Sequence, residues 1–111
     1  MALKTARQDI DYYNGDSMTK SYTVTLGGVA VDLSGDSLIL TIKKTKKGTA
    51  IATLSTATGT ITVSGADNNI VNLIFNNEFD EERIYLQDLY NITDDDTIWY
   101  GNLNVTLEVH D

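Results

Sequence analysis

The sequence predicts an all-β protein, a sandwich or barrel of seven or eight short strands. Apolar and polar residues alternate along several stretches, and a period of two places apolar side chains on one face of a strand. Glycine, asparagine and aspartate interrupt these stretches at short intervals, as expected for tight connections between strands. Both observations favour strands that each bury one face against a shared core.

Four alternating stretches mark the main strands and their inward-facing residues. The clearest lies near the end of the chain, where Asn102, Asn104 and Thr106 separate the apolar positions. From first to last, the residues expected in the core are Tyr22, Val24 and Leu26; Leu38, Leu40 and Ile42; Val71, Leu73 and Phe75; and Leu103, Val105, Leu107 and Val109.

The predicted turns combine residues that tolerate positive φ or form hydrogen bonds with their own backbone. They are Asn14-Gly15, Gly27-Gly28, Ser34-Gly35, Lys47-Gly48, the segment from Ser64-Gly65 to Asn69, and Asp94-Asp95-Asp96. One short helix is expected near residues 77–84. Asn76 or Asn77 can cap it, and the acidic residues that follow suit the positive end of a helix dipole.

The length of 111 residues predicts a single domain. We expect residues 1–10 to form an N-terminal arm and residues 11–111 to form the domain. The arm has two interpretations: a strand added to a neighbouring protein, or a frayed terminus. The first predicts that removal of residues 1–10 impairs assembly while the domain still folds.

Composition excludes several classes of function. The chain has no cysteine, so disulfides and thiolate metal sites are impossible. No apolar stretch is long enough for a transmembrane helix, and the N-terminus lacks the apolar run of a secretory signal. We therefore expect no membrane partner. A formal charge of −8 also argues against nucleic acid, because phosphate binding needs clustered lysine and arginine.

Four lysines depart locally from the acidic composition. Lys43, Lys44, Lys46 and Lys47 are half of the eight basic residues in the chain. One interpretation is a solvated hairpin tip. The other is a docking point for an acidic neighbour, which includes another copy of this protein. We take these lysines as candidate partner contacts.

The sequence offers little for catalysis or metal binding. Gly35-Asp36-Ser37-Leu38 matches the four letters of a GDSL esterase signature, and Gly15-Asp16-Ser17 matches its first three. That chemistry needs a histidine with a nearby aspartate, whereas the only histidine is His110, with Leu107 three residues before it. Three adjacent aspartates, Asp94 to Asp96, do not converge on a cation by themselves. We expect no enzyme, no metal and no cofactor.

The aromatic residues Trp99 and Tyr100 are the remaining candidate contacts. With Tyr85 and Tyr90 nearby in the sequence, they can form a platform on which a sugar stacks. Aromatic residues also fill sandwich cores and oligomer interfaces, and the sequence leaves these alternatives open.

The order of these elements resembles the small Ig-like domains of tailed-bacteriophage proteins, notably the N-terminal domain of the baseplate upper protein family. Asn14-Gly15-Asp16 and the strand after it resemble the opening of those domains, and Val31-Asp32-Leu33-Ser34-Gly35 resembles their next corner. A strand that ends in basic residues follows at Leu38 to Lys44. The family's helix, tyrosine-bearing strand with an Asp-Leu pair, and last strand correspond to Glu78 to Ile84, Tyr85 with Asp88-Leu89, and Gly101 to Val109. Arg83-Ile84 stands where the family usually has a glycine before the tyrosine.

The resemblance implies an Ig-like antiparallel β-sandwich that acts through protein–protein contacts. The implied function is that of a virion structural or adaptor protein in the tail, baseplate or neck, assembled in the host cytoplasm. Its partners would be other phage structural proteins or further copies of itself. The alternative function is capsid decoration or binding to a carbohydrate or protein of the host surface.

Overall fold

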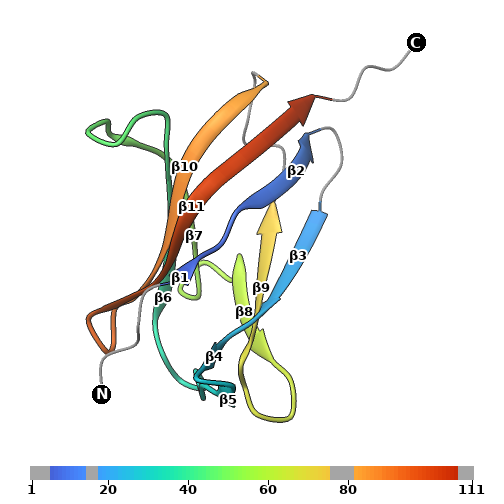
Figure 1. Cartoon of the computed structure of the whole chain (residues 1–111), viewed down its shortest axis with the longest axis vertical. Helices are drawn as coiled ribbons and strands as arrows, with labels where there is room; N and C mark the ends of the chain where they lie inside the picture. Colours follow the sequence, from blue (N-terminus) through green and yellow to red (C-terminus); the bar gives the residue numbers. More distant parts are fainter. Residues whose placement is uncertain (1–5, 15–17, 76–81, 108–111) are drawn as a thin grey trace.

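The computed structural model describes residues 6–14, 18–75 and 82–107, and this part of the chain forms two packed β-sheets (Figure 1). All of its regular structure is β. The strands are β1 (Ala6–Arg7), β2 (Ile10–Asn14), β3 (Met18–Thr23), β4 (Thr25–Leu26), β5 (Val29–Ala30), β6 (Leu38–Lys43), β7 (Ala50–Ser55), β8 (Ile61–Ser64), β9 (Ile70–Phe75), β10 (Arg83–Asn91) and β11 (Asp96–Leu107). Eight of these strands have four or more residues, in agreement with the seven or eight predicted.

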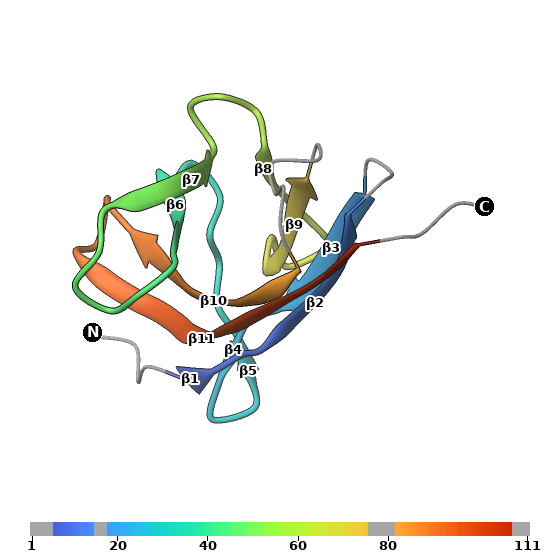
Figure 2. The ribbon, with the colours of Figure 1, turned by 90° about the horizontal axis from the view of Figure 1, so that it is seen from above.

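The strand order defines the architecture. The larger sheet runs β1-β11-β10-β6-β7, with β2 also paired to β11. The smaller sheet runs β3-β9-β8, and β4 and β5 form a separate hairpin. Seen from above, β3, β8 and β9 are grouped away from β6 and β7 (Figure 2). Two sheets in this order, β6-β10-β11 facing β3-β9-β8, form an Ig-like β-sandwich whose larger sheet is extended by β7.

The edge formed by β1 and β2 departs from the predicted antiparallel arrangement, because both strands pair with β11 in parallel. The chain leaves β2 at Asn14 and next enters β3 in the smaller sheet. β2 therefore has no hairpin partner in its own sheet. It lies instead beside β11, the last strand that the structure describes, and nothing in that connection requires opposite directions.

Three of the four alternating stretches place their described apolar side chains in the core as predicted, and the first does so only in part. Leu38, Leu40 and Ile42 are buried, and so are Val71, Leu73 and Phe75 and, on β11, Leu103 and Val105. Val24 is buried, whereas Tyr22 and Leu26 are half-buried. Two ring contacts join the sheets: Tyr12 with Phe75 at 4.8 Å between centroids, and Tyr22 with Trp99 at 5.4 Å. The predictions for Leu107 and Val109 lie outside the side chains that the structure describes.

The predicted turns within the described residues connect strands. Asn68 and Asp95 have φ of 53° and 56°, a left-handed conformation that asparagine and aspartate tolerate. At the corner before β6, Asp32 accepts hydrogen bonds from the hydroxyl and the amide of Ser34, at 2.7 and 2.9 Å. These bonds lower the pKa of the Asp32 carboxyl. The Asn14-Gly15 turn extends beyond the described residues.

The predicted helix near residues 77–84 is wrong in its last part. Arg83 and Ile84 belong to β10 and pair with Val105 and Asn104 of β11. At these two residues, pairing with β11 outweighs the helix preference that the capping and acidic residues upstream indicate. Residues 77–81 lie outside the described residues.

The predicted N-terminal arm also needs correction from residue 6 onward. Ala6 and Arg7 pair with Trp99 and Tyr100, and the side chain of Ile10 is fully buried. Ile10 pairs with Leu103 and is part of the core of its own chain, so release of this segment to a neighbour would first expose a buried apolar side chain. Residues 1–5 lie outside the described part.

Candidate functional site

A shallow concavity of about 390 Å³ lies on the outer face of the larger sheet, beside the hairpin that joins β6 to β7. It is lined by one residue from that hairpin and by residues of three adjacent strands. These are Lys46 from the hairpin; Thr41 and Lys43 from β6; Leu86, Gln87 and Asp88 from β10; and Tyr100 and Gly101 from β11.

Strand alternation explains why these side chains meet. On β6, Leu40 and Ile42 point into the core, so Thr41 and Lys43 point outward. Asp88 is paired with Thr41 on one side and with Tyr100 on the other. Directly paired residues share a face of the sheet, so all three stand side by side around the concavity.

Lysine and aspartate of opposite charge occupy neighbouring positions in this concavity. Partial burial raises the pKa of the Asp88 carboxyl above its ordinary value, and the ammonium of Lys43 lowers it by less. The ionised carboxylate is therefore incompletely solvated in the folded protein. Tyr100 is 49% exposed beside it, so an apolar and a charged surface adjoin.

We expect Asp88→Asn to raise the free energy of unfolding at neutral pH by no more than about 1 kcal/mol, because water still reaches the group. A raised pKa in the folded state means that ionisation costs stability, and the cost is absent where the carboxyl is protonated in both states. The advantage of the variant should vanish as the pH falls below 3.8, the ordinary value for aspartate. Urea unfolding at pH 7 and pH 3 checks this, and equal differences at both pH values would contradict it.

The structure brings together three of the predicted partner contacts, Lys43, Lys46 and Tyr100. Lys44 and Lys47 are exposed on the same hairpin but do not line the concavity. The carbonyl oxygen of Lys44 accepts a hydrogen bond of 3.3 Å from Arg83 Nη2, which ties the base of the hairpin to β10.

Trp99 is not an exposed contact, in contrast to its assignment from the sequence. Its side chain is 4% exposed, and its Nε1 donates a hydrogen bond of 2.7 Å to Oε1 of Gln87. Tyr85 is buried as well. The predicted aromatic platform is therefore mostly core, and Tyr100 alone among its members is largely exposed.

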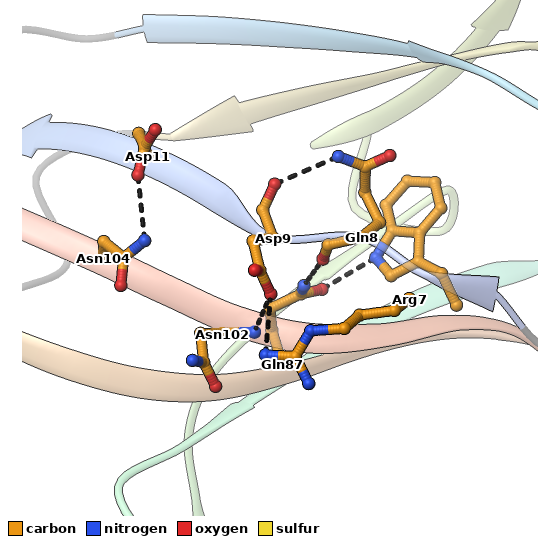
Figure 3. A network of polar contacts seen from close by, with 8 residues as sticks. Arg7, Gln8, Asp9, Asp11, Gln87, Asn102 and Asn104 are labelled. Carbon is orange, nitrogen blue, oxygen red and sulfur yellow. Dashed lines mark hydrogen bonds and ion pairs between the residues drawn. The ribbon is translucent and has the colours of Figure 1, made fainter.

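A polar network holds the sheet behind the concavity (Figure 3). The buried Gln87 accepts from Trp99 and donates from Nε2 to the carbonyl of Gln8, which lies between β1 and β2. Asp9 accepts from the amide of Asn102 at 2.9 Å and forms an ion pair of 3.3 Å with Arg7. These contacts fix the N-terminal edge against β10 and β11. With no cysteine in the chain, they tie the strands together without a disulfide.

The residues of the esterase-like stretch have structural partners. Asp36 Oδ2 accepts a hydrogen bond of 3.0 Å from Nδ2 of the buried Asn91, and Thr93 Oγ1 accepts one from the amide of Ser37 at 2.9 Å. His110 and Gly15-Asp16-Ser17 lie outside the described residues. Within the described ranges, no group of three or more histidine, cysteine, aspartate or glutamate side chains could hold a metal ion.

Sequence reasoning missed Gln87 and Asp88 as parts of this site. Gln87 sits at an inward position of β10, between Tyr85 and Leu89. A polar amide among apolar inward positions signals a buried hydrogen-bond network, and that signal is readable in the sequence. The place of Asp88 beside Tyr100 depends on the register between β10 and β11, which the sequence does not specify.

No protein-family model matches the chain, and no curated protein matches it. Among solved structures, it is similar to the ZIG-8-RIG-5 IG1-IG1 heterodimer in its monoclinic form, with 14% identity, a TM-score of 0.43, and coverage of 91% of this chain and 83% of that one. It is also similar to the ZIG-8 IG1 homodimer, with 14% identity, a TM-score of 0.39, and coverage of 92% and 81%. The Ig-like assignment rests on the strand order and register described above. No helix in the described part of the chain is long and apolar enough to cross a membrane.

Proposed function

We propose that the protein is a non-enzymatic binding module that joins components of a tailed-bacteriophage particle, in the tail, baseplate or neck. The observation that carries the binding role is the meeting of Lys43, Lys46 and Tyr100 around one concavity. The phage assignment rests on the order of sequence elements, above all Val31-Asp32-Leu33-Ser34-Gly35 and the strand after it.

The chemistry of the concavity favours an acidic segment of a partner protein. Two ammonium groups attract a carboxylate, and the exposed ring of Tyr100 offers apolar area beside them. Tyrosine is enriched among the residues that dominate protein interfaces, because it combines a large apolar surface with few rotatable bonds. The carboxylate of Asp88 repels a carboxylate of the ligand close to β10. An acidic ligand is therefore expected to direct its carboxylates toward Lys43 and Lys46 and away from Asp88.

Host-surface carbohydrate binding or capsid decoration is the second candidate. One observation favours a sugar ligand: Asp88 lies directly beside the half-exposed Tyr100, so a carboxylate acceptor adjoins an aromatic face. Glycan-array binding that is lost in Tyr100→Ser but kept in Lys46→Glu would support this function over the adaptor.

For the adaptor, we expect virions purified from the host that produces the protein to contain it in fixed stoichiometry. The double substitution Lys46→Glu and Tyr100→Ser should lower its incorporation at least about tenfold, because one change reverses the charge and the other removes apolar area. Quantitative mass spectrometry of purified particles measures both quantities. Thr62→Ser, an exposed position on β8, is the control and should leave incorporation unchanged.

Particles that lack the protein altogether would contradict the virion assignment. Unchanged incorporation of the double variant would contradict the role of the concavity while leaving the virion assignment intact. The two parts of the proposal therefore fail separately.

A further inference from the structure

The strand β7 is an open edge of the larger sheet. It stands last in the strand order, after β6, and its residues Ala50 to Ser55 include no charge and no proline. Ile51 is 43% exposed on it. An unprotected, uncharged edge is a template for pairing with another strand, and proteins usually block such edges with charges, prolines or covering segments.

The hydrogen-bond pattern shows which backbone groups of β7 point outward. The amide of Thr56, directly after β7, donates to the carbonyl of Leu38, and the amide of Leu38 donates to Thr56 Oγ1, so these two residues face each other across the ladder. Bonded pairs alternate along an antiparallel ladder, so Leu54 and Ala52 also bond to β6, and the amide and carbonyl of Thr53 face away from it. The next outward amide, at Ser55, is already bonded to Thr60 Oγ1 at 2.9 Å. Thr53 is therefore the centre of the available edge.

The other edges are less suited to pairing. The edge of β1 and β2 carries Arg7 and Asp11, with Asp9 between the two strands, and β3 carries Lys20. The β8 edge is uncharged but has only four residues. β7 is the longest uncharged edge strand in the described part of the chain.

The charges at the two ends of this sheet are complementary. The connection between β6 and β7 carries Lys44, Lys46 and Lys47, and this lysine hairpin immediately precedes β7. Asp36 and Asp94 lie at the opposite end of the sheet, where both contact Asn91. Figure 1 shows the β6–β7 hairpin and the β10–β11 turn at opposite ends of the sheet. If a second β7 pairs antiparallel, it carries its lysine hairpin toward the aspartates of the first copy, and the converse contact forms by symmetry.

We propose that β7 is the docking edge for β7 of a second copy of this chain, in a two-fold dimer with one continuous sheet centred near Thr53. The backbone of Thr53 supplies hydrogen bonds, Ile51 adds apolar contact, and the lysine hairpin of each copy faces the acidic end of its partner. The β7 edge lies outside the concavity, and the lysine hairpin borders both surfaces.

The test uses a matched pair of substitutions on the two uncharged edges. Thr53→Lys brings one lysine from each copy to the centre of the proposed two-fold interface, where the two ammonium groups repel each other. Thr62→Lys places the same residue on β8, outside that interface. We expect sedimentation equilibrium of the full chain to show a concentration-dependent dimer whose dissociation constant rises at least about tenfold in Thr53→Lys and stays within about twofold in Thr62→Lys. Thermal unfolding of each variant checks that both retain the fold.

Electrostatics provides a second, independent measurement. Lys47→Glu should weaken the dimer, because it reverses a charge on the lysine hairpin that faces the aspartates of the partner copy. Lys47 lies outside the concavity, so this substitution tests the dimer alone. A salt concentration of about 0.5 M should weaken the unsubstituted dimer by screening the same contacts. Tyr100→Ser should leave the dimer intact. A protein that remains monomeric at every concentration reached would overturn the proposal. So would a dimer that Thr62→Lys or Tyr100→Ser weakens more than Thr53→Lys does.

Discussion

Removal of residues 1–10 is expected to cost the domain about 5 kcal/mol, enough to unfold much of the population. The deletion takes away the fully buried side chain of Ile10, and truncation of a buried isoleucine costs about 2–5 kcal/mol. It also removes the Gln8 carbonyl that accepts from Gln87, which leaves a buried amide unpaired at about 1–3 kcal/mol. A typical domain has only about 5–15 kcal/mol of stability.

Urea unfolding followed by tryptophan fluorescence measures this effect, because Trp99 lies in the core and bonds to Gln87. Removal of residues 1–5 alone is the matched control and should change stability by no more than about 0.5 kcal/mol. A folded, fully stable protein without residues 1–10 would restore the interpretation of the whole segment as a free arm.

The N-terminal edge shows where sequence reasoning stops. The segment before Ile10 lacks a long alternating pattern, so composition alone classified it as an arm. Its position depends on parallel pairing with β11, at residues some ninety positions away. A contact between such distant segments leaves no local signature, although the buried Ile10 and Tyr12 follow the period-two rule.

The core, by contrast, was largely predictable. Leu38, Leu40 and Ile42 alternate with Ile39, Thr41 and Lys43, and the first three are fully buried. Alternation fixes the face of a strand without reference to its partners. The concavity needed more information, because Lys43, Asp88 and Tyr100 belong to three strands whose register only the structure provides.

Trp99 illustrates a limit of a different kind. A tryptophan beside a tyrosine near a turn suits either a core or a contact surface, and the sequence left both open. Alternation continued back from the buried Leu103 through Gly101 places Trp99 on the inward face, where it pairs with Leu89. Trp99 then shares the inward face with Leu89, and Tyr100 the outward face with Asp88. The register shift between Leu89 and Tyr90 lets Ile98 be buried directly before Trp99, and two adjacent buried residues obscure the alternation in the sequence.

Substitution of Gly101 by alanine is expected to destabilise the domain by about 3 kcal/mol or more, at the upper end of the costs of overpacking. A Cβ at this position would collide with the carbonyl oxygen of Gln8 and come within 2.7 Å of Asp9 Oδ1. The first of these atoms belongs to the backbone, so no side-chain rotation relieves the contact. The segment between β1 and β2 would have to move away from β11, which also breaks the bonds from Gln87 to Gln8 and from Asn102 to Asp9.

Gly27→Ala separates this steric effect from the general cost of replacing glycine. Gly27 has φ of +60° and open space around the position of a Cβ, so its replacement costs only the backbone strain of about 1–2 kcal/mol. Gly101 has no such φ, and its cost is therefore contact alone. Chemical denaturation of the two variants should rank Gly101→Ala well below Gly27→Ala in stability. The reverse order would mean that the N-terminal edge does not pack closely on β11. It would also contradict the reason given for the large effect of removing residues 1–10.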